Sequence, residues 1–451
     1  MVPFFSDAEE RSAALSATCF CGGESGRGEY IVVRKRPATH EGYECPAFST
    51  ETNRCNVYDD RPLDCRIYPF VLAYDLTGTR VVLALDMLCS YAFENQNAPV
   101  IHEIARCVAN ALDNELLSKV VEASGIIGEL DDSQMEMAQL PNLTRRMCRT
   151  DLGLSRLTTS VMSDLKPYFE AIPRDLSAHS FASIYVWRDF FDLTWKVVDD
   201  RLLIVAEDGG AAFLFVPPLG RGPIKPAAQE VLHILKWFNG DGPATRIENV
   251  DQDSLHEFQA LGWKIQNHTE EFIGDREAWA SLAGNALKSQ RAACNYFEKH
   301  TDSWTWRAFQ PDDLLSIVEL YRRWSAGRCE AHSSPFFNAM IKNSFLTHLR
   351  ALREAETLGI VAHVAEIDGK LAAFTYGCEL PGGDAFAILG EVADLDIKGL
   401  PAFVFRQFCR ELKAYRRINI MGDSDLPNLR EVKLQYHPEQ VVGAYTIVPN
   451  S

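Results

Sequence analysis

The 451-residue sequence has no long apolar run, no basic leader and no short-period repeat. Its longest apolar stretches, such as residues 68–74, are far shorter than the ~18 residues that a membrane-spanning helix needs. Near the N-terminus, Asp7, Glu9 and Glu10 interrupt a short apolar start, so the pattern of a secretory signal is missing. We therefore expect a cytoplasmic protein without a transmembrane segment.

Positive charge is also scarce, with 45 Lys and Arg against 62 Asp and Glu and a formal net charge of −17. This balance argues against a surface that is basic overall, and hence against tight nonspecific binding of nucleic acid or anionic membranes. A hydrophobic content of 47% suffices for two or three ordinary domains with full cores. It excludes a disordered or fibrous chain.

Cysteine, by contrast, is plentiful in the N-terminal part of the sequence. Four thiols surround a rigid, aromatic-rich turn at residues 55–70, which also contains two prolines and two arginines. Thiolates select zinc, copper(I) or iron–sulfur centres, and neighbouring arginines favour the thiolate over the thiol. We predict that the metal ligands are Cys45, Cys55, Cys65 and Cys89, with Cys19 and Cys21 as further candidates.

The other cysteines stand alone in apolar patterns, which is typical of buried small hydrophobic residues. They are Cys107, Cys148, Cys294, Cys329, Cys378 and Cys409. A disulfide framework among the N-terminal cysteines is the alternative to a metal site, but it would need an oxidising compartment.

Residues 15–95 resemble the CxxCxxCC (YkgJ-like) family of cysteine-cluster domains that chelate zinc or iron. The segment reads Cys, Tyr, Arg-Pro, Cys-Arg and Tyr-Pro-Phe at that family's spacing. The resemblance implies a small metal-binding domain with zinc, iron or an iron–sulfur cluster as cofactor. The sequence departs from the family upstream, where Cys19-Phe20-Cys21-Gly22-Gly23 stands in place of the full cysteine run.

Beyond the cysteines, residues 98–124 read as a helix and residues 125–140 as an acidic, turn-prone break. Strands and helices then alternate, so the fold class is α/β (α+β). We place a metal-binding domain with a helical extension at residues 1–155, a first α/β unit at 165–275, and a linker helix with a second α/β unit at 276–451. The two α/β units could be a diverged duplication.

The first α/β unit is expected to contain strands 193–198, 202–207, 211–216, 246–250 and 263–273, with helices 225–238 and 254–261. A long amphipathic helix over 275–299 leads to the second unit. There we expect strand 304–309, helices 312–325 and 335–357, strands 360–367, 370–379 and 384–392, helix 400–414, strand 418–422, helix 426–436 and strand 441–448. This order is that of a GNAT-type acyltransferase, and Asp368-Gly369 suits a hairpin turn.

The sequence from residue 363 to 448 resembles the C-terminal domain of bacterial phosphatidylglycerol lysyltransferases, and weaker similarity extends back to residue 165. The matching residues include Ile367-Asp368-Gly369-Lys370, Gly390-Glu391, Asn419, Asp423, Leu429-Arg430, Lys433 and Tyr436-His437-Pro438. The resemblance implies two GNAT units in tandem, a fold that Fem-type peptidyltransferases also use. It also implies transfer of an aminoacyl group from aminoacyl-tRNA.

Aminoacyl transfer needs a positioned acceptor, donors for the tetrahedral oxyanion and a group that takes the proton. Lys433 and Arg430 could stabilise the oxyanion or the tRNA terminus, while the carboxylates hold an ammonium group or accept a proton. The predicted catalytic residues are Glu391, Asn419, Asp423, Arg430, Lys433 and Tyr436, and the predicted substrate-binding residues of the linker helix are Lys288, Arg291 and Asn295. The alternative is that these charges are ordinary loop carboxylates and a solvated helix face.

Coenzyme A is disfavoured as the acyl donor. An acetyl-CoA enzyme binds the pyrophosphate through backbone amides of a glycine-rich loop before a helix. Here that loop, residues 394–401, brings Asp394 and Asp396, and Pro401 removes an amide donor.

The leading hypothesis is an acyltransferase that moves an aminoacyl group from tRNA to an amine or hydroxyl acceptor and carries an accessory thiolate metal site. Because the sequence has no membrane domain to deliver a lipid, we expect a soluble peptide, protein or small molecule as acceptor. Two alternatives stay open. One is a non-catalytic metal-binding or redox-sensing interaction protein, and the other is an iron- or iron–sulfur-dependent protein-modifying enzyme.

Overall fold

The computed structural model describes residues 61–450 except 209–210, 241, 332–334 and 425, together with short stretches before residue 61. It divides into a first unit, residues 1–161, and a second unit, residues 162–451. The sequence predicts a boundary near residues 155–170 and two separate α/β units beyond it; here both of these units belong to the second unit. Among the described residues, no helix combines the length and apolar composition that crossing a membrane requires.

The first unit is centred on a four-stranded sheet in the order β10-β8-β9-β11. Strands β8 and β9 are apolar and almost wholly buried, and they pair antiparallel. The elements from residue 61 onward are α2 (Leu63–Ile67), β8 (Phe70–Tyr74), β9 (Val81–Asp86), α3 (Ser90–Asn95), α4 (Pro99–Asn110), α5 (Leu117–Glu122), β10 (Gly128–Glu129), β11 (Gln134–Gln139), α6 (Pro141–Met147) and β12 (Ser155–Arg156).

Short strands precede residue 61. They are β1 (Phe4–Phe5), β2 (Phe20–Gly22), β3 (Glu29–Ile31), β4 (Arg34–Lys35), β5 (Tyr43–Glu44), β6 (Phe48–Ser49) and β7 (Arg54–Cys55). They pair antiparallel as β1-β3-β2, β4-β5 and β6-β7.

Two expectations for the first unit need correction. The helix predicted over residues 98–124 is interrupted by a π-helical turn at Ala111–Glu115, which separates α4 from α5. The stretch expected to be a break, residues 125–140, contains β10 and β11. Strand β11 pairs with β9 at the edge of the sheet and is only partly buried. Its composition is therefore mixed polar and apolar and does not predict a strand.

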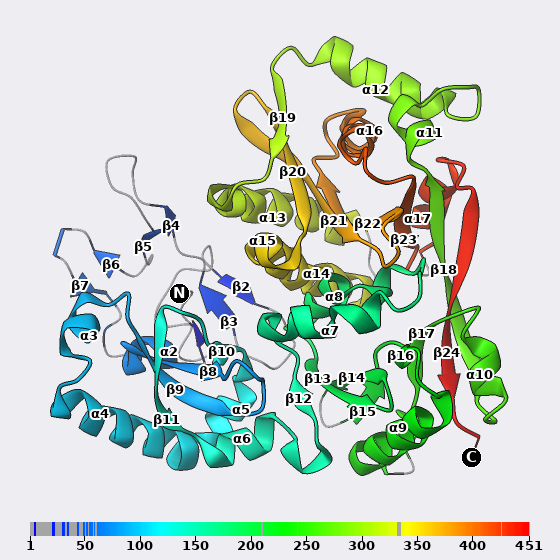
Figure 1. Cartoon of the computed structure of the whole chain (residues 1–451). Helices are drawn as coiled ribbons and strands as arrows, with labels where there is room; N and C mark the ends of the chain where they lie inside the picture. Colours follow the sequence, from blue (N-terminus) through cyan, green and yellow to red (C-terminus); the bar gives the residue numbers. More distant parts are fainter. Residues whose placement is uncertain are drawn as a thin grey trace. The chain divides into compact units, whose positions relative to one another are not determined.

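The second unit is built on one continuous sheet (Figure 1) in the order β13-β14-β15-β17-β24-β18-β23-β22-β21-β20-β19, with β16 paired to β14. Its first half, residues 162–275, contains α7 (Met162–Phe169), α8 (Phe181–Tyr185), β13 (Asp192–Val198), β14 (Arg201–Asp208), β15 (Ala211–Leu214), β16 (Leu219–Gly220), α9 (Ile224–Asn239), β17 (Ile247–Asp251), α10 (Leu255–Gln259) and β18 (Lys264–Asp275). Helices α11 (Arg276–Ser281) and α12 (Lys288–His300) follow.

The second half, residues 301–451, repeats the order of the first. It contains β19 (Trp304–Ala308), α13 (Leu314–Ala331), α14 (Pro335–Arg353), α15 (Ala355–Leu358), β20 (Val361–Ile367), β21 (Lys370–Glu379), β22 (Ala385–Ala393), α16 (Leu400–Glu411), β23 (Arg417–Gly422), α17 (Pro427–Leu434) and β24 (Gln440–Val448). In both halves helices precede three antiparallel strands, and a helix, a strand, a helix and a strand follow. The predicted tandem α/β organisation is therefore confirmed.

The hairpin between β20 and β21 is also confirmed. Asp368 and Gly369 both have positive φ angles, 51° and 72°, as the two central residues of a type I′ turn require. The single helix predicted over residues 275–299 is instead two helices. Leu282 and Gly284 adopt left-handed conformations, with φ of 51° and 82°, which an α-helix cannot continue through.

The final strands of the two halves are exchanged. Strand β24, from the second half, lies between β17 and β18 and pairs antiparallel with both. Strand β18, from the first half, pairs with β23 of the second half. Figure 1 shows β18 and β24 running side by side through the unit. Residues from the first half are thereby carried next to the polar side chains of the second.

Candidate functional site

The candidate site lies where β22 and β23 stop pairing. These parallel strands pair over Ala385–Ala387 and Arg417–Asn419, and no further pairs follow among the described residues. Glu391 lies beyond the paired segment of β22, and Asp423 directly follows β23. Helix α17 comes next and carries Arg430 and Lys433. The predicted catalytic residues therefore come from neighbouring strand ends and one helix.

Lys433 is anchored to the end of β23. Its Nζ donates hydrogen bonds to the carbonyl oxygens of Ile420 and Gly422, both at 2.5 Å. Burial lowers the pKa of Lys433 to about 8, and the negative charges of Glu271, Asp423 and Glu391 oppose this shift. An ammonium has three protons to donate, so one remains for a substrate oxygen.

Glu391 has one carboxyl oxygen, Oε2, that is buried without a partner among the described residues. Burial raises the pKa of this group from 4.5 to about 8, although the positive charge of Lys433 lowers it. A carboxyl group with a strongly raised pKa is a candidate for a functional site.

Asn419 performs a structural task. It is fully buried, and its Nδ2 donates to the carbonyl oxygen of Asp175 at 2.7 Å and to Glu271 Oε2 at 2.6 Å. Its Oδ1 accepts from the backbone N–H of Met421 at 2.6 Å. Glu271 also accepts from the N–H and hydroxyl of Ser177, at 2.8 and 2.6 Å. Asn419 thus joins β23 to β18 and to the loop before α8, as a positioning residue.

Arg430 and Asp423 form an ion pair at the surface edge of the site. Arg430 contacts Asp423 Oδ2 at 3.0 Å and Glu270 Oε2 at 2.5 Å, and these carboxylates raise its pKa. The Asp423 carboxylate is mostly buried, whereas the Arg430 side chain is 43% exposed. The guanidinium of Arg430 is therefore accessible to solvent, and Asp423 and Glu270 hold its direction.

Tyr436 lies in the core behind Glu391. Its ring packs on Phe405 with centroids 4.3 Å apart, and its carbonyl oxygen accepts from Trp279 Nε1 at 2.7 Å. Burial and the nearby charge of Glu391 raise the pKa of its hydroxyl well above the ordinary value. The phenol therefore stays protonated and can act only as a neutral donor or acceptor.

The linker residues predicted to bind substrate are placed differently from one another. Lys288 and Asn295 are exposed on α12, whereas Arg291 donates to the carbonyl oxygens of Leu282 and Gly284. Arg291 thus stabilises the turn between α11 and α12. The side of α12 nearest the candidate site instead presents Gln290, whose Nε2 lies 3.3 Å from Gln435 Oε1.

The loop expected to disfavour coenzyme A is closely covered by α12. Gly399 precedes α16 with a φ of 87°, and a Cβ atom there would lie 2.3 Å from the carbonyl oxygen of Ala293. Within the loop, the Asp394 carboxylate accepts a hydrogen bond from the backbone N–H of Asp396, with Oδ1 and N 3.1 Å apart. The loop before α16 thus carries acidic side chains and packs closely against α12 at Gly399.

Two features of the site and its surroundings were not predicted from the sequence. Glu271 reaches the site only because β18 is exchanged between the halves, so no local pattern could identify it.

His348 Nδ1 lies 2.8 Å from the Tyr376 hydroxyl, and burial lowers the pKa of this histidine to about 4. A Cβ at Gly390 would lie 2.5 Å from the Tyr376 ring, which explains the glycine before Glu391.

The predicted metal ligands fall partly outside the described residues, because Cys19, Cys45 and the side chain of Cys21 are not described. Cys55, Cys65 and Cys89 are partly buried and free of disulfides. Within the described part of the chain, no three Cys, His, Asp or Glu side chains gather as metal ligands would. The described thiols alone therefore do not form a metal site, and the ligand set stays a prediction.

Comparisons with known families match both parts of the chain. The family model "Phosphatidylglycerol lysyltransferase, C-terminal" matches residues 169–448, and the CxxCxxCC model, "Putative zinc- or iron-chelating domain", matches residues 23–91. Both resemblances found in the sequence are thereby confirmed. A search of curated proteins found no match.

Solved structures resemble about two thirds of this chain. A conserved protein of unknown function from Bacteroides thetaiotaomicron aligns over 66% of this chain and 99% of its own, with 21% identity and a TM-score of 0.58. L-PGS from Bacillus licheniformis aligns over 64% and 91%, with 16% identity and a TM-score of 0.47. The Bacteroides likeness shows the fold alone. Since the lysyltransferase model spans more than half of the sequence, the chain belongs to the phosphatidylglycerol lysyltransferase C-terminal family.

Proposed function

We propose that this acyltransferase-type protein transfers an aminoacyl group from aminoacyl-tRNA to an amine or hydroxyl acceptor. The observation that carries the proposal is the ammonium of Lys433, anchored by two carbonyl oxygens at the end of β23, together with the buried Oε2 atom of Glu391, which has no hydrogen-bonding partner among the described residues. The pKa of Glu391 is raised to about 8. Family membership supports the same chemistry, because it links the chain to lysyltransferases.

In the proposed reaction the acceptor amine or hydroxyl attacks the ester carbonyl carbon of the aminoacyl-tRNA. A C–N or C–O bond forms, and the ester bond to the tRNA 3′-oxygen breaks. Ionised Glu391 takes the proton from the acceptor and returns it to the leaving oxygen, while the Lys433 ammonium stabilises the oxyanion. Arg430 binds the donor from the exposed edge of the site.

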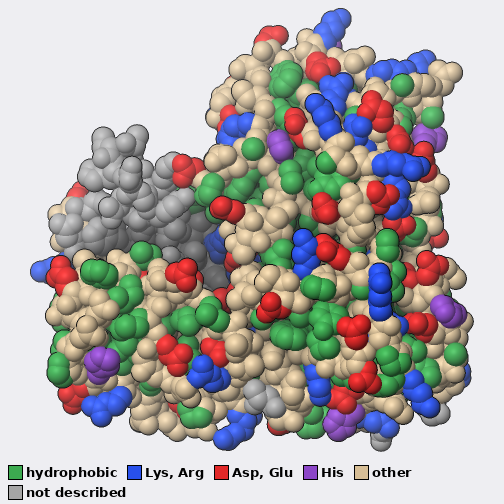
Figure 2. All heavy atoms as spheres, viewed as in Figure 1, with side chains coloured by type: hydrophobic (Ala, Val, Ile, Leu, Met, Phe, Trp, Pro, Cys, Tyr) green, Lys and Arg blue, Asp and Glu red, His purple; other side chains and the backbone are tan. Residues whose placement is uncertain are grey.

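Two further observations bear on the substrates. Acidic loop residues and α12 crowd the region before α16, which supports a donor other than coenzyme A. On the face in Figure 2, Lys and Arg side chains alternate with Asp and Glu over the second unit. Binding of tRNA would therefore depend on a limited set of cations, and a soluble peptide, protein or small molecule remains the proposed acceptor. A thiolate site for zinc or iron in the first unit is the proposed accessory centre.

The proposal is tested by incubating the protein with a pool of labelled aminoacyl-tRNA and candidate acceptors, and by following label transfer. Lys433→Ala should reduce transfer by about 10²-fold or more, the scale for losing one transition-state contact. Lys370→Ala, which removes an exposed lysine at the β20–β21 turn, is the matched control. Circular dichroism confirms that both variants fold.

A second measurement addresses the donor. Calorimetry with acetyl-CoA should detect no site tighter than about 1 mM, or roughly −4 kcal/mol. Tight coenzyme A binding, or unchanged label transfer by Lys433→Ala, would contradict the proposed reaction.

A further inference from the structure

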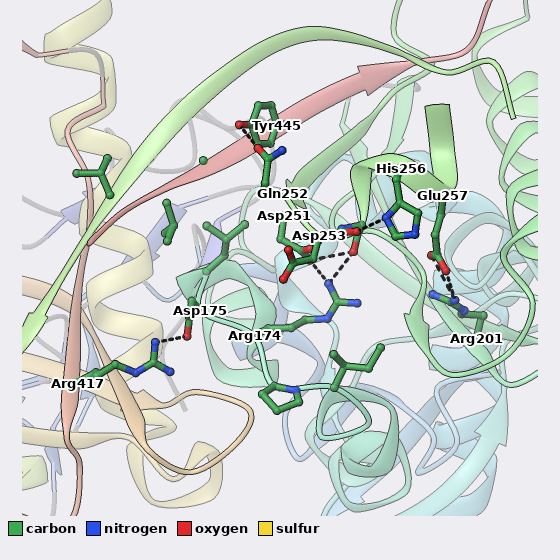
Figure 3. Close-up of a pocket in the computed structure, with 17 residues that line it drawn as sticks. Arg174, Asp175, Arg201, Asp251, Gln252, Asp253, His256, Glu257, Arg417 and Tyr445 are labelled. Atoms are coloured by element: carbon green, nitrogen blue, oxygen red, sulfur yellow. Dashed lines mark hydrogen bonds and ion pairs between the residues drawn. The ribbon is translucent and has the colours of Figure 1, made fainter. Parts of the chain in front are cut away.

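The second unit contains a cavity of about 610 Å³ that the proposed transfer does not use. Five parts of the chain form its walls (Figure 3): the loop at residues 172–176, Arg201 at the start of β14, residues 251–257 around the start of α10, Arg417 at the start of β23, and residues 441–445 of β24. The last wall comes from the second half through the strand exchange. Arg417 is ion-paired with Asp175 at 2.8 Å. The volume is within the usual range for small-molecule sites, ~300–1,000 Å³.

Two deeply buried arginines line this cavity. The side chains of Arg174 and Arg201 are only 5% and 7% exposed. Arg174 Nη1 contacts Asp251 and lies 3.2 Å from Ser254 Oγ, whereas its Nε and Nη2 donate to none of the described residues. Figure 3 shows both guanidinium groups in the cavity wall below α10.

The two guanidinium groups also repel each other. Burial lowers the pKa of Arg174, Asp251 opposes this shift, and the positive charge of Arg201 lowers the pKa further. Arg201 contacts Glu257 at 3.2 Å and donates to the carbonyl oxygens of Gly222 and Pro218, at 2.6 and 3.1 Å. An anionic group near both arginines would bond to the unused N–H groups of Arg174 and relieve the repulsion.

Negative charge is also available at the cavity. Asp253 is exposed, and its carboxylate has no partner among the described residues. Asp251 faces the same space with its side chain 19% exposed. Tyr445 closes one side, and its hydroxyl lies 2.5 Å from Gln252 Oε1. Asp251 is already bonded to Arg174 and Ser254, so the cavity offers buried guanidinium groups and one accessible carboxylate, that of Asp253.

We propose that this cavity binds a small zwitterion, either a free amino acid or a short peptide with free ends. The carboxylate of the ligand lies against Arg174 and Arg201, and its ammonium group faces the exposed carboxylate of Asp253. A simple anion would leave Asp253 unpaired, and a simple cation would leave the N–H groups of Arg174 unused. The proposal concerns binding alone, so it stands or falls independently of the aminoacyl transfer.

Calorimetry on the full chain with the dipeptide L-Ala-L-Ala tests the proposal. We expect one site with a Kd of about 1 mM or tighter. The N-acetylated dipeptide, which lacks the ammonium group, and the dipeptide methyl ester, which lacks the carboxylate, should each bind about 10-fold more weakly. No binding at millimolar dipeptide, or equal binding of all three compounds, would overturn the proposal. Inorganic phosphate binding as tightly as the dipeptide would also overturn it, since it would identify a simple anion site.

Two variants locate the binding. Asp253→Asn changes an exposed side chain, so the fold should be preserved. The substitution should weaken binding of the dipeptide by about 10-fold and leave binding of the N-acetylated dipeptide unchanged. Asp302→Asn, at an exposed position before β19, is the matched control and should bind like the parent protein. Equal binding by the two variants would place the dipeptide elsewhere and refute the assignment.

Discussion

The pH dependence of folding stability should report directly on Glu391. Its pKa is raised from 4.5 to about 8 in the folded protein, so ionisation is favoured in the unfolded chain. Below about pH 4.5 the carboxyl is neutral in the folded and the unfolded state, so its ionisation does not change the free energy of unfolding. As pH rises toward 8, the unfolded chain alone releases this proton, so the residue increasingly destabilises the fold.

The magnitude follows from the two pKa values. Between about pH 5 and pH 8, the destabilisation by Glu391 should grow by about 3 kcal/mol. Glu391→Gln cannot ionise, so its stability relative to the parent protein should rise by the same amount over this range. Any effect of the amide on packing is independent of pH and cancels from the comparison.

Urea unfolding of the parent protein and Glu391→Gln at several pH values measures this difference. Glu366→Gln is a useful control, because Glu366 is a partly exposed carboxylate in an ion pair with Arg307. A constant stability difference between the parent and Glu391→Gln from pH 5 to pH 8 would refute the reasoning. It would mean that the carboxyl is hydrated or paired in the folded protein.

Three other predictions follow from the site, the loop and the cysteines. The rate of label transfer should follow a narrow bell-shaped pH profile with its maximum near pH 8, because Glu391 must be ionised while Lys433 is still protonated. A rate that rises steadily to about pH 10 would contradict these roles. Gly399→Ala should lower stability by about 1–3 kcal/mol in thermal unfolding because its methyl group meets a carbonyl oxygen of α12, whereas Gly369→Ala, with open space around its Cβ, should lower it less. Elemental analysis should find close to one zinc or iron per chain and less metal in Cys65→Ser; equal metal content in both proteins would exclude this ligand.

Much of the second unit could be predicted because its sequence signals are local. Buried strands such as β21, with its run of apolar residues, and the turn at Asp368-Gly369 are recognisable from a few neighbouring residues. The helix over residues 275–299 was predicted wrongly as continuous because its composition is helical throughout. The break depends on the left-handed conformation of Leu282, which packing of the surrounding helices stabilises and no local signal indicates.

The candidate site could be predicted only in part. Lys433 and Arg430 follow from family resemblance and helix spacing, and the structure brings them to the end of β23 beside Asp423. The participation of Glu271, and the cavity beside Arg174 and Arg201, depend on contacts between residues far apart in the sequence. Such contacts are set by sheet topology and strand order, which periodicity within a single strand does not contain.

The exchange of β18 and β24 has a consequence for synthesis on the ribosome. Strand β17 obtains its second neighbour only from β24, and β18 pairs with β23 and β24. While the chain is being made from its N-terminus, the first half thus exposes unpaired strand edges until β24 has emerged. Open edges of this kind favour aggregation and pairing with other chains. We therefore expect the first half to complete its sheet only when β23 and β24 of the second half are present.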